Sequence, residues 1–466
     1  MIYFDFEESF LVAGLIIIML VIGWFTLSLI LRQQRKMLFL HPGWIMVTLP
    51  VIYGVSTPFF ILIGKAKRFG LNPDLLGFYN FNNVLQIMLM YTITLLGFFV
   101  AQGFISTINS PVATKQKGRM INGRGDWFLT KTASKVLTFL LLCIVSLGCV
   151  SMISYYSHFG GIKEFLSINR VIRYQELHDL GMYSTFNAFF SIGFLVYTYR
   201  LVTSKETSRS NWLLMVLLFS FYFFQQTITG SRLGVTTLAL GIGFVVFTAK
   251  PNLIIENKRA LLIISSIIIS FFVVWQAGRS IVPMYLLTGH VDWTLVAGSD
   301  FSRGETVTGY IPGLIMLYVG KNQFRALYVA RVFTFSPALI SRFLGITKPE
   351  PLSVLISPFQ NVRRGSSIYT VTLPIDIYMS MGMVGVFVIS LLLYLLFYYV
   401  IKRLVAKGNI SVVLAGIVFM NLFYVIRVEV GNWVSKMLSN TLVFCIFVGL
   451  YLFLINMFGS EELRAD

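Results

Sequence analysis

The chain alternates between long apolar runs and short polar segments over most of its length. The apolar runs cover approximately residues 10–31, 43–64, 83–106, 136–156, 183–199, 211–229, 233–249, 260–277, 378–401, 410–426 and 437–458. Most of them approach the roughly 20 residues that a helix needs to cross the hydrocarbon core of a bilayer. The period-2 alternation of membrane barrels is absent, and lipid leaves helices as the other spanning structure. The pattern predicts an all-α, polytopic integral membrane protein with about 11 transmembrane helices.

Composition agrees with a bilayer as the solvent of this chain. Charged residues make up 12% of the sequence and hydrophobic residues 56%, whereas a soluble domain carries about 25% charged residues. The net charge of +18 could suggest a nucleic-acid partner, but the basic residues lie in short loops between apolar runs. Positive loops on the cytoplasmic side explain most of the charge. We therefore expect membrane lipid as a partner and no nucleic acid.

The positions of lysine and arginine predict the orientation of the spans. Basic loops follow every second apolar run, which places the N-terminus outside and the tail after Phe458 inside. The basic cluster at 65–68 is the exception, because this topology places it outside. The first apolar run follows acidic residues, which argues for a retained helix and against a cleaved signal. The sequence thus predicts one transmembrane domain, residues 1–466, with two outer loops at about 157–182 and 278–367.

The outer loops carry many basic residues, against the usual orientation rule. They are Lys163, Arg170, Arg173, Arg279, Arg303, Lys321, Arg325, Arg331, Arg342, Lys348, Arg363 and Arg364. Snorkelling toward lipid headgroups is the plain explanation for any one of them. The surplus as a whole favours an anionic ligand near the outer membrane surface, because the guanidinium fork suits phosphate oxygens.

Two arginines occupy tighter positions. Arg232 is the only charged residue between Ser210 and Ala249, and both ends of that stretch are predicted to be cytoplasmic. The stretch must therefore fold as a hairpin whose turn is 229–232 (Thr-Gly-Ser-Arg), at the outer boundary of the hydrocarbon. A second tight outer turn, 427–432, begins with Arg427. An ionisable group at membrane depth is a functional hypothesis by default.

These motifs resemble those of Wzy-type oligosaccharide repeat-unit polymerases. The 229–232 turn resembles the family's Gly-Gly/Ser-Thr/Ser-Arg turn, and Arg170 to Gly181 resembles its Arg-x10-Gly pattern. The late segment 427–436 (RVEVGNWVSK) resembles the Arg/Glu turn of enterobacterial members. About eleven spans, two unequal outer loops and a short cytoplasmic tail are similar too. The larger loop departs from the pattern, since neither Arg363 nor Arg364 is followed by a glycine at the matching spacing.

The resemblance implies a GT-C-like glycosyltransferase in the bacterial inner membrane, with a periplasmic N-terminus and two unequal periplasmic loops. Its substrate would be an undecaprenyl-diphosphate-linked glycan, and a chain-length regulator protein would be a partner. Arginines would stabilise charge on the departing diphosphate, like an oxyanion hole. The expected catalytic residues are Arg232, Arg303, Arg427 and Glu429, and the expected diphosphate-binding residues are Arg170, Arg173, Arg363 and Arg364. Glu305, Asp300 and His178 are further candidates for a base.

Several alternatives stay open. An O-antigen ligase would use the same donor, although its large outer loop usually carries a functional histidine and this one has only His290. A flippase or secondary transporter would need buried charges or gapped helices, and Asp376 is the one carboxylate expected at membrane depth. Trp293 and Trp433 fit either an interfacial belt or stacking on a sugar. No metal-ligand spacing occurs, which predicts an enzyme with no metal and no cofactor.

Overall fold

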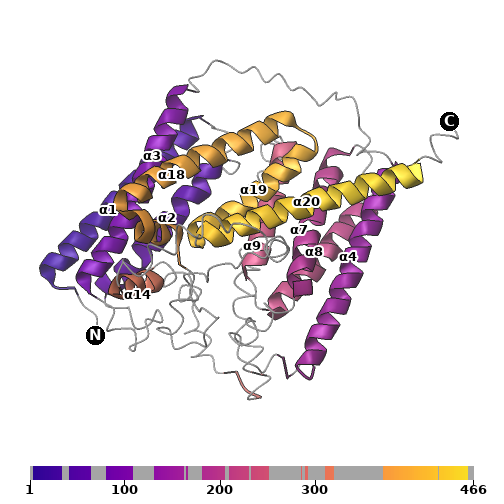
Figure 1. Cartoon of the computed structure of the whole chain (residues 1–466), viewed down its shortest axis with the longest axis horizontal. Coiled ribbons are helices and arrows are strands. Elements are labelled where there is room, and N and C mark those ends of the chain that lie inside the picture. Colours follow the sequence, from indigo (N-terminus) through magenta and orange to yellow (C-terminus); the bar gives the residue numbers. More distant parts are fainter. Residues whose placement is uncertain are drawn as a thin grey trace. The chain divides into compact units, whose positions relative to one another are not determined.

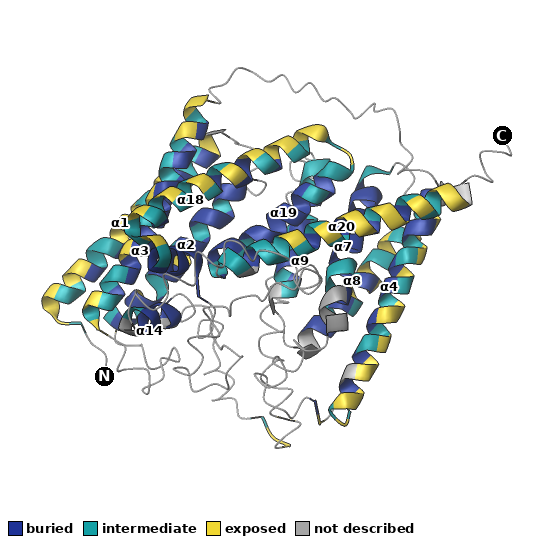
Figure 2. Ribbon diagram, viewed as in Figure 1, coloured by how far each residue is buried: buried dark blue, intermediate teal, exposed yellow. Residues whose placement is uncertain are grey.

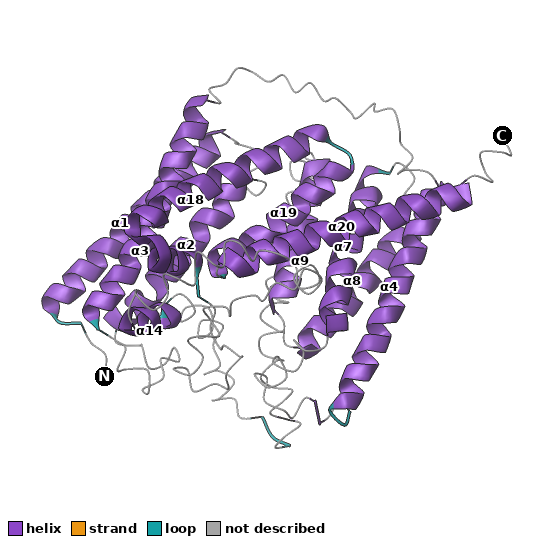
Figure 3. Ribbon diagram, viewed as in Figure 1, coloured by secondary structure: helices purple, strands orange, loops and turns teal. Residues whose placement is uncertain are grey.

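A computed structural model describes residues 4–33, 41–63, 80–108, 131–161, 164–165, 181–204, 209–229, 232–250, 285, 289–291, 310–319, 371–428 and 430–459. Within these ranges the only regular secondary structure is helical (Figure 3). The helices are α1 (Phe6–Gln33), α2 (Pro42–Leu62), α3 (Phe81–Ile108), α4 (Lys131–His158), α7 (Gly181–Thr203), α8 (Arg209–Thr229), α9 (Arg232–Ala249), α14 (Ile311–Val319), α18 (Leu373–Lys407), α19 (Ile410–Arg427) and α20 (Val430–Gly459) (Figure 1).

Ten of these helices coincide with predicted spans, and the predicted span 260–277 lies outside the described residues. Within the described part, 7 helices are long and apolar enough to cross a membrane, namely α1, α2, α3, α4, α18, α19 and α20. The apolar part of α9, Gly234–Ala249, is shorter. The described part of the chain is therefore all-helical, as expected of a polytopic membrane protein. The full number of spans stays a prediction.

The surface of the described helices is apolar where a soluble protein would be polar. Phe10, Trp24, Leu147 and Phe453 are all more than 60% exposed, and Figure 2 shows exposed faces along α1, α4, α18 and α20. Soluble monomers rarely expose apolar patches of this extent. A lipid solvent removes the penalty, so these faces are explained by a bilayer around the bundle.

The chain divides into two compact units, each of which has its own internal packing. Unit 1 contains α1, α2, α3, α14, the part of α18 up to Ile401, the end of α19 from Asn421 and the start of α20 up to Leu438. Unit 2 contains α4, α7, α8, α9 and the remaining parts of α19 and α20.

Helices α3 and α18 of unit 1 run parallel, as the alternating topology predicts for two odd-numbered spans. Gln86 donates a hydrogen bond to the Tyr378 hydroxyl, and Tyr394 donates to the Gln102 side chain at 2.7 Å. The two pairs have the same sequence offset, 292 residues. A Cβ on Gly97 would lie 2.9 Å from the Phe387 carbonyl oxygen. The two backbones are therefore in contact, and only glycine fits between them.

The N-terminus of α18 departs from the predicted span, which begins at residue 378. The helix begins at Leu373, and every residue from Leu373 to Met379 is buried. It is interrupted at Gly382, where φ is 71° and ψ is −168°, a conformation essentially restricted to glycine. Hydropathy alone does not reveal this short buried segment before the break.

The N-terminus of α2 is closed by a buried histidine. The Nδ1 atom of His41 accepts a hydrogen bond from the Gly43 N–H at 3.1 Å, and Pro42 follows at the first helical position. Burial lowers the pKa of His41 to about 4. The imidazole is therefore neutral near pH 7, as this cap requires. Its ring also packs 5.2 Å from that of Tyr398.

Unit 2 is built around α7, which packs against α4, α8 and α9. The rings of Phe190 and Tyr222 stack at 4.9 Å between α7 and α8, and Phe244 of α9 packs 4.6 Å from Phe419 of α19. Phe190 and Tyr222 belong to one apolar core that draws on all the helices of the unit. The hydroxyl of Tyr451 in α20 donates to the Ala133 carbonyl of α4 at 3.0 Å. Such side-chain bonds across helices supplement van der Waals packing in lipid.

Candidate functional site

Two of the predicted site residues lie in described helices: Arg232, the first residue of α9, and Arg427, the last residue of α19. The others lie outside the described residues, and their roles stay predictions. They are Arg170, Arg173, Asp300, Arg303, Glu305, Arg363, Arg364, Glu429, His178 and Trp293. Each of these two arginines lies at a helix–helix turn, and the two turns are described separately, one within each unit.

The first turn joins α8 to α9. Helix α8 ends at Thr229 and α9 begins at Arg232, so only residues 230 and 231 connect them. The two helices pack against each other beside this turn, where α9 residue Gly234 approaches α8 residues Gln226 and Tyr222. The predicted hairpin with Arg232 at its turn is confirmed.

A largely buried polar cluster lies next to this turn, and we name it the amide cluster: Asn187, Ser191, Tyr222 and Gln226. The Nε2 atom of Gln226 donates to Oδ1 of Asn187 at 2.8 Å. The Ser191 hydroxyl donates to the Tyr222 hydroxyl at 3.3 Å. Gln226 is only 2% exposed, and a buried polar side chain is costly unless it is hydrogen-bonded. The cluster therefore ties α7 to α8 beneath Arg232.

Gly234 makes this arrangement possible. A Cβ at this position would lie 2.5 Å from the Gln226 Oε1 atom and 3.1 Å from the Tyr222 hydroxyl. The Tyr222 hydroxyl and the Gln226 amide group, through its Nε2 atom, both take part in hydrogen bonds of the amide cluster. The sequence argument missed the cluster, although Gln225-Gln226 is a visible signal, being two adjacent amides inside an apolar run.

The helix dipole gives Arg232 an unfavourable backbone position. A helix N-terminus carries partial positive charge, and a cation there is disfavoured, typically by about 0.3–1 kcal/mol at exposed positions. Arg232 is the first residue of α9. Local helix energetics therefore do not explain this arginine.

The second turn joins α19 to α20. The sequence predicts a turn over 427–432, but α19 ends at Arg427 and α20 already begins at Val430. The predicted turn was too long. Helix α20 begins earlier than predicted because of a tertiary contact, in which the Val430 N–H donates a hydrogen bond to Oδ2 of Asp376 at 2.8 Å. A carboxylate at a helix N-terminus satisfies a backbone donor and complements the dipole.

Asp376 is 1% exposed, and its depth in the membrane stays a prediction. It comes from the buried first turn of α18. Nearby in sequence, Tyr378 bonds to Gln86, and the Thr372 hydroxyl lies 2.8 Å from that of Tyr91. The start of α18 thus carries a row of buried polar groups, each with a partner in another element of unit 1.

Arg427 and Trp433 flank the second turn. The Arg427 guanidinium carbon is 6.0 Å from the centre of the Phe423 ring, a cation–π distance. Arg427 ends a helix, where the dipole favours a cation. Trp433 is 6% exposed and packs 5.7 Å from Phe397. An indole that anchors a protein at the lipid interface is exposed, so Trp433 does not form part of such a belt.

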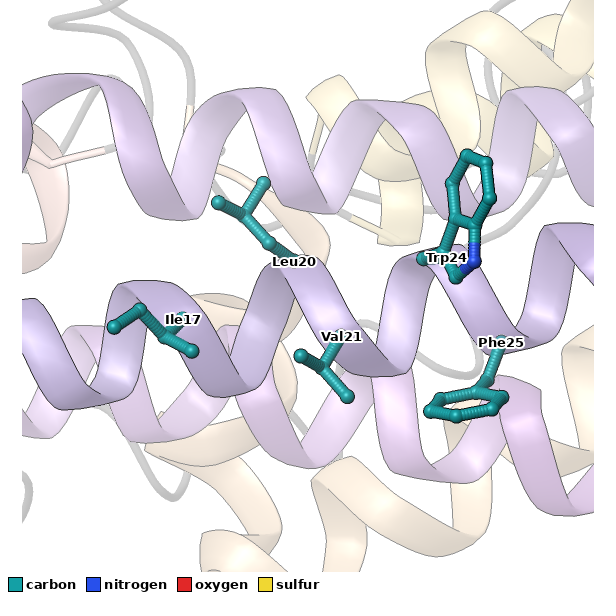
Figure 4. A pocket seen from close by; sticks show the side chains of 5 residues that line it. All are labelled: Ile17, Leu20, Val21, Trp24 and Phe25. Atoms are coloured by element: carbon teal, nitrogen blue, oxygen red, sulfur yellow. The ribbon is translucent and has the colours of Figure 1, made fainter.

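A surface pocket on α1 offers no comparable chemistry. It is lined by Ile17, Leu20, Val21, Trp24 and Phe25, which follow one another along a single exposed helix face (Figure 4). A hydrocarbon chain of a lipid fits such a lining. Within the described ranges, no three histidine, cysteine or acidic residues lie close enough to hold a metal ion.

No protein-family model, curated protein or solved structure matches this chain. The similarity to Wzy-type polymerases thus rests on the sequence motifs given above.

Proposed function

We propose that the chain is a glycosyltransferase of the bacterial inner membrane that polymerises undecaprenyl-diphosphate-linked oligosaccharide repeat units. The product would be an O-antigen or a related surface polysaccharide, and the architecture would be GT-C-like. The observation that carries the proposal is Arg232, the first residue of α9 in a two-helix turn backed by the buried amide cluster. Neither helix energetics nor a surrounding polar loop explains a cation there.

The proposed reaction transfers the growing glycan to a new repeat unit. A hydroxyl oxygen of the acceptor sugar forms a bond to the anomeric carbon of the donor sugar, while the bond from that carbon to the diphosphate oxygen breaks. The hydroxyl proton passes to a base, for which Glu429 is the first candidate. Undecaprenyl diphosphate leaves with its electron pair. A diphosphate is already a good leaving group, so neither a nucleotide nor a metal is required.

Arginines are assigned to the charge that develops on the leaving group. Arg232, Arg303 and Arg427 are proposed to act in the transition state, and Arg170, Arg173, Arg363 and Arg364 to bind the diphosphate. Two unit charges about 4 Å apart interact by roughly 4 kcal/mol at an effective dielectric near 20. Several such pairs would hold the lipid carrier firmly at the outer membrane surface. A chain-length regulator would act on the same complex.

A transporter or flippase of lipid-linked oligosaccharides is the second candidate. Two observations favour it: Asp376 is a buried carboxylate, and α18 is interrupted at Gly382. Discontinuous helices and buried ionisable groups are typical of transport sites. The O-antigen ligase alternative has no comparable observation in its favour within the described helices.

Deletion of the gene followed by gel analysis of surface polysaccharide separates these candidates. A polymerase mutant loses the ladder but retains a single repeat unit, whereas a ligase or flippase mutant loses every attached repeat. Complementation with the wild-type gene should restore the ladder, and complementation with Arg232→Ala should not, at equal protein levels in the membrane. A normal ladder from Arg232→Ala would remove the main support for the proposal.

A further inference from the structure

Asp376 makes a contact that reaches across the sequence to the second turn. Its Oδ2 atom accepts the Val430 N–H at 2.8 Å, over a separation of 54 residues. Val430 is the first residue of α20, and only residues 428 and 429 separate it from the end of α19. The carboxylate is therefore attached to the backbone of the turn that carries Arg427 and Glu429.

The segment of α18 that carries Asp376 is fixed by packing and by hydrogen bonds. All the residues from Leu373 to Met379 are buried, so Asp376 belongs to a packed segment. The hydrogen bond from Gln86 to Tyr378 and the contact between Tyr91 and Thr372 fix the same segment to α3. A movement of Asp376 relative to the rest of unit 1 would break these bonds. The segment thus provides a fixed anchor point for the start of α20.

The first N–H groups of α20, like those of any helix, have no partners in their own helix. In the described part of the turn, the Val428 N–H donates to the Tyr424 carbonyl of α19 at 3.0 Å, and the Val430 N–H donates to Asp376. An ionised acceptor forms a shorter and stronger bond to such a group than a neutral one does. The bond to Asp376 therefore sets where α20 begins and, through the short connection, where Arg427 lies.

We propose that Asp376 is a positioning residue of the polymerase, which holds the α19/α20 turn so that Arg427 and Glu429 meet the reacting groups. This inference rests on the proposed function. In a transporter, the buried carboxylate of Asp376 would take part in ion coupling. In this proposal it accepts a fixed hydrogen bond from the backbone instead. Asp376 does not contact the substrate in this proposal and gains or loses no proton.

The first test compares substitutions on both sides of the bond in purified protein in lipid vesicles, with a lipid-linked repeat unit as substrate. Asp376→Ala removes the acceptor, and Val430→Pro removes the donor while proline remains favourable at the first position of a helix. Misplacing a catalytic group by about 1 Å can cost on the order of 100-fold. We expect kcat to fall by at least tenfold in both variants with little change in KM. Asp376→Asn keeps an acceptor oxygen and should recover most of this loss.

Tyr394→Phe is the matched control for loss of a buried hydrogen bond. Tyr394 is in the same helix, is as buried as Asp376 and donates one bond, to Gln102 of α3, which is not part of the turn. We expect its kcat to stay within about twofold of wild type, since only a modest hydrogen bond outside the turn is lost. Equal losses in Tyr394→Phe and Asp376→Ala would overturn the positioning role, because the effect would then be general destabilisation.

A double substitution tests the route through Arg427. If Asp376 acts by placing Arg427 and its turn, Asp376→Ala should lower kcat much less in an Arg427→Ala background than in the wild type. A full additional loss of tenfold or more would overturn the route through Arg427, because Asp376 would then act independently of that residue.

A labelling experiment separates this inference from the proposed function. Val428, in the turn, is 8% exposed, so a cysteine there should react slowly with a membrane-impermeant maleimide. The background would lack Cys143, Cys149 and Cys445. Asp376→Ala and Val430→Pro should raise the labelling rate severalfold, whereas Asp376→Asn and Tyr394→Phe should not. Unchanged labelling in the first two would overturn the positioning role, whatever reaction the protein catalyses. If labelling rises but gene deletion leaves the polysaccharide ladder intact, the proposed function fails alone.

Discussion

The α8/α9 turn and the α19/α20 turn have the same outline but place their arginines at opposite helix ends. Each joins two apolar helices through two residues, 230–231 in the first and 428–429 in the second. Arg427 ends a helix, where the dipole favours a cation, and Arg232 begins one, where it does not. At the start of α20, the first N–H group donates a hydrogen bond to the buried carboxylate of Asp376. The start of α9 carries Arg232 instead.

The difference ranks the two arginines as functional candidates. At the second turn the charges satisfy local helix energetics, so Arg427 and Asp376 each have a sufficient structural reason to be present. At the first turn the charge opposes local energetics, and the turn is backed by paired amides. An arginine in such a position needs a compensating partner, and under the proposed function the phosphate-bearing substrate would supply one. Substitution of Arg232 is therefore a more direct test of the proposed function than substitution of Arg427.

The largest expected effect is that of Arg232→Ala. Removing one preorganised group that stabilises transition-state charge typically costs about 100- to 1,000-fold in kcat, so the polysaccharide ladder should disappear. Arg427→Ala should cost less, roughly tenfold, since part of its energy serves the helix end. Initial rates in vesicles and gel ladders measure both, with membrane protein levels as the control. A larger loss of kcat in Arg427→Ala than in Arg232→Ala would contradict this ranking of the two arginines.

Alanine at two matched glycines should give the next largest effect. Gly234 and Gly431 both lie in the first turn of the helix that follows each arginine. A Cβ at Gly234 would meet the Gln226 amide, whereas nothing lies within 4 Å of a Cβ at Gly431. Overpacking costs typically about 1–3 kcal/mol, so Gly234→Ala should lower both the thermal unfolding midpoint in detergent and the polymerisation rate.

Gly431→Ala should leave the midpoint unchanged or raise it slightly, because alanine is favoured over glycine in a helix by about 0.5–1 kcal/mol. Gly243→Ala serves as a second control within α9, since its Cβ would meet only Phe247 at an ordinary 3.8 Å. Equal changes of the unfolding midpoint in all three variants would contradict the close packing of the amide cluster against α9.

A smaller effect is expected from the amide pair behind the first turn. Asn187→Leu or Gln226→Leu alone leaves a buried amide without this partner, at a cost of about 1–3 kcal/mol. The double substitution replaces both groups and should recover part of the lost stability. Thermal unfolding of the four proteins in detergent gives the coupling energy, which averages about 0.6 kcal/mol for hydrogen bonds between membrane helices. Strictly additive losses would mean that the pair is not coupled.

The smallest expected effect is that of a chelator. Both turns are assigned arginine as the source of positive charge, so polymerisation in vesicles should keep its rate when divalent metals are removed. The test is a comparison of the initial polymerisation rates with and without the chelator. Activity that vanished and returned with magnesium would refute metal independence and would weaken the role given to both arginines.

The sequence alone determined the helical elements and one of the two turns. Apolar runs of membrane length are local, and ten of them reappear as helices because a bilayer permits few other structures. The direction of α18 relative to α3 also followed from counting spans, and the bonds of Gln102 and Gln86 agree with it. The hairpin at Arg232 was predictable because Gly230 and Ser231 interrupt a stretch with no other charge.

Only the tertiary structure decided where α18 and α20 begin. Hydropathy sees neither the buried segment before Gly382 nor the early start of α20, because the group that caps α20 is Asp376, 54 residues away. The amide cluster is likewise assembled from two helices, α7 and α8. Helix ends and buried polar groups must find hydrogen-bond partners, and in a bundle those partners come from distant segments of the chain. Local pattern fixes which segments are helices, and their packing fixes which polar groups meet.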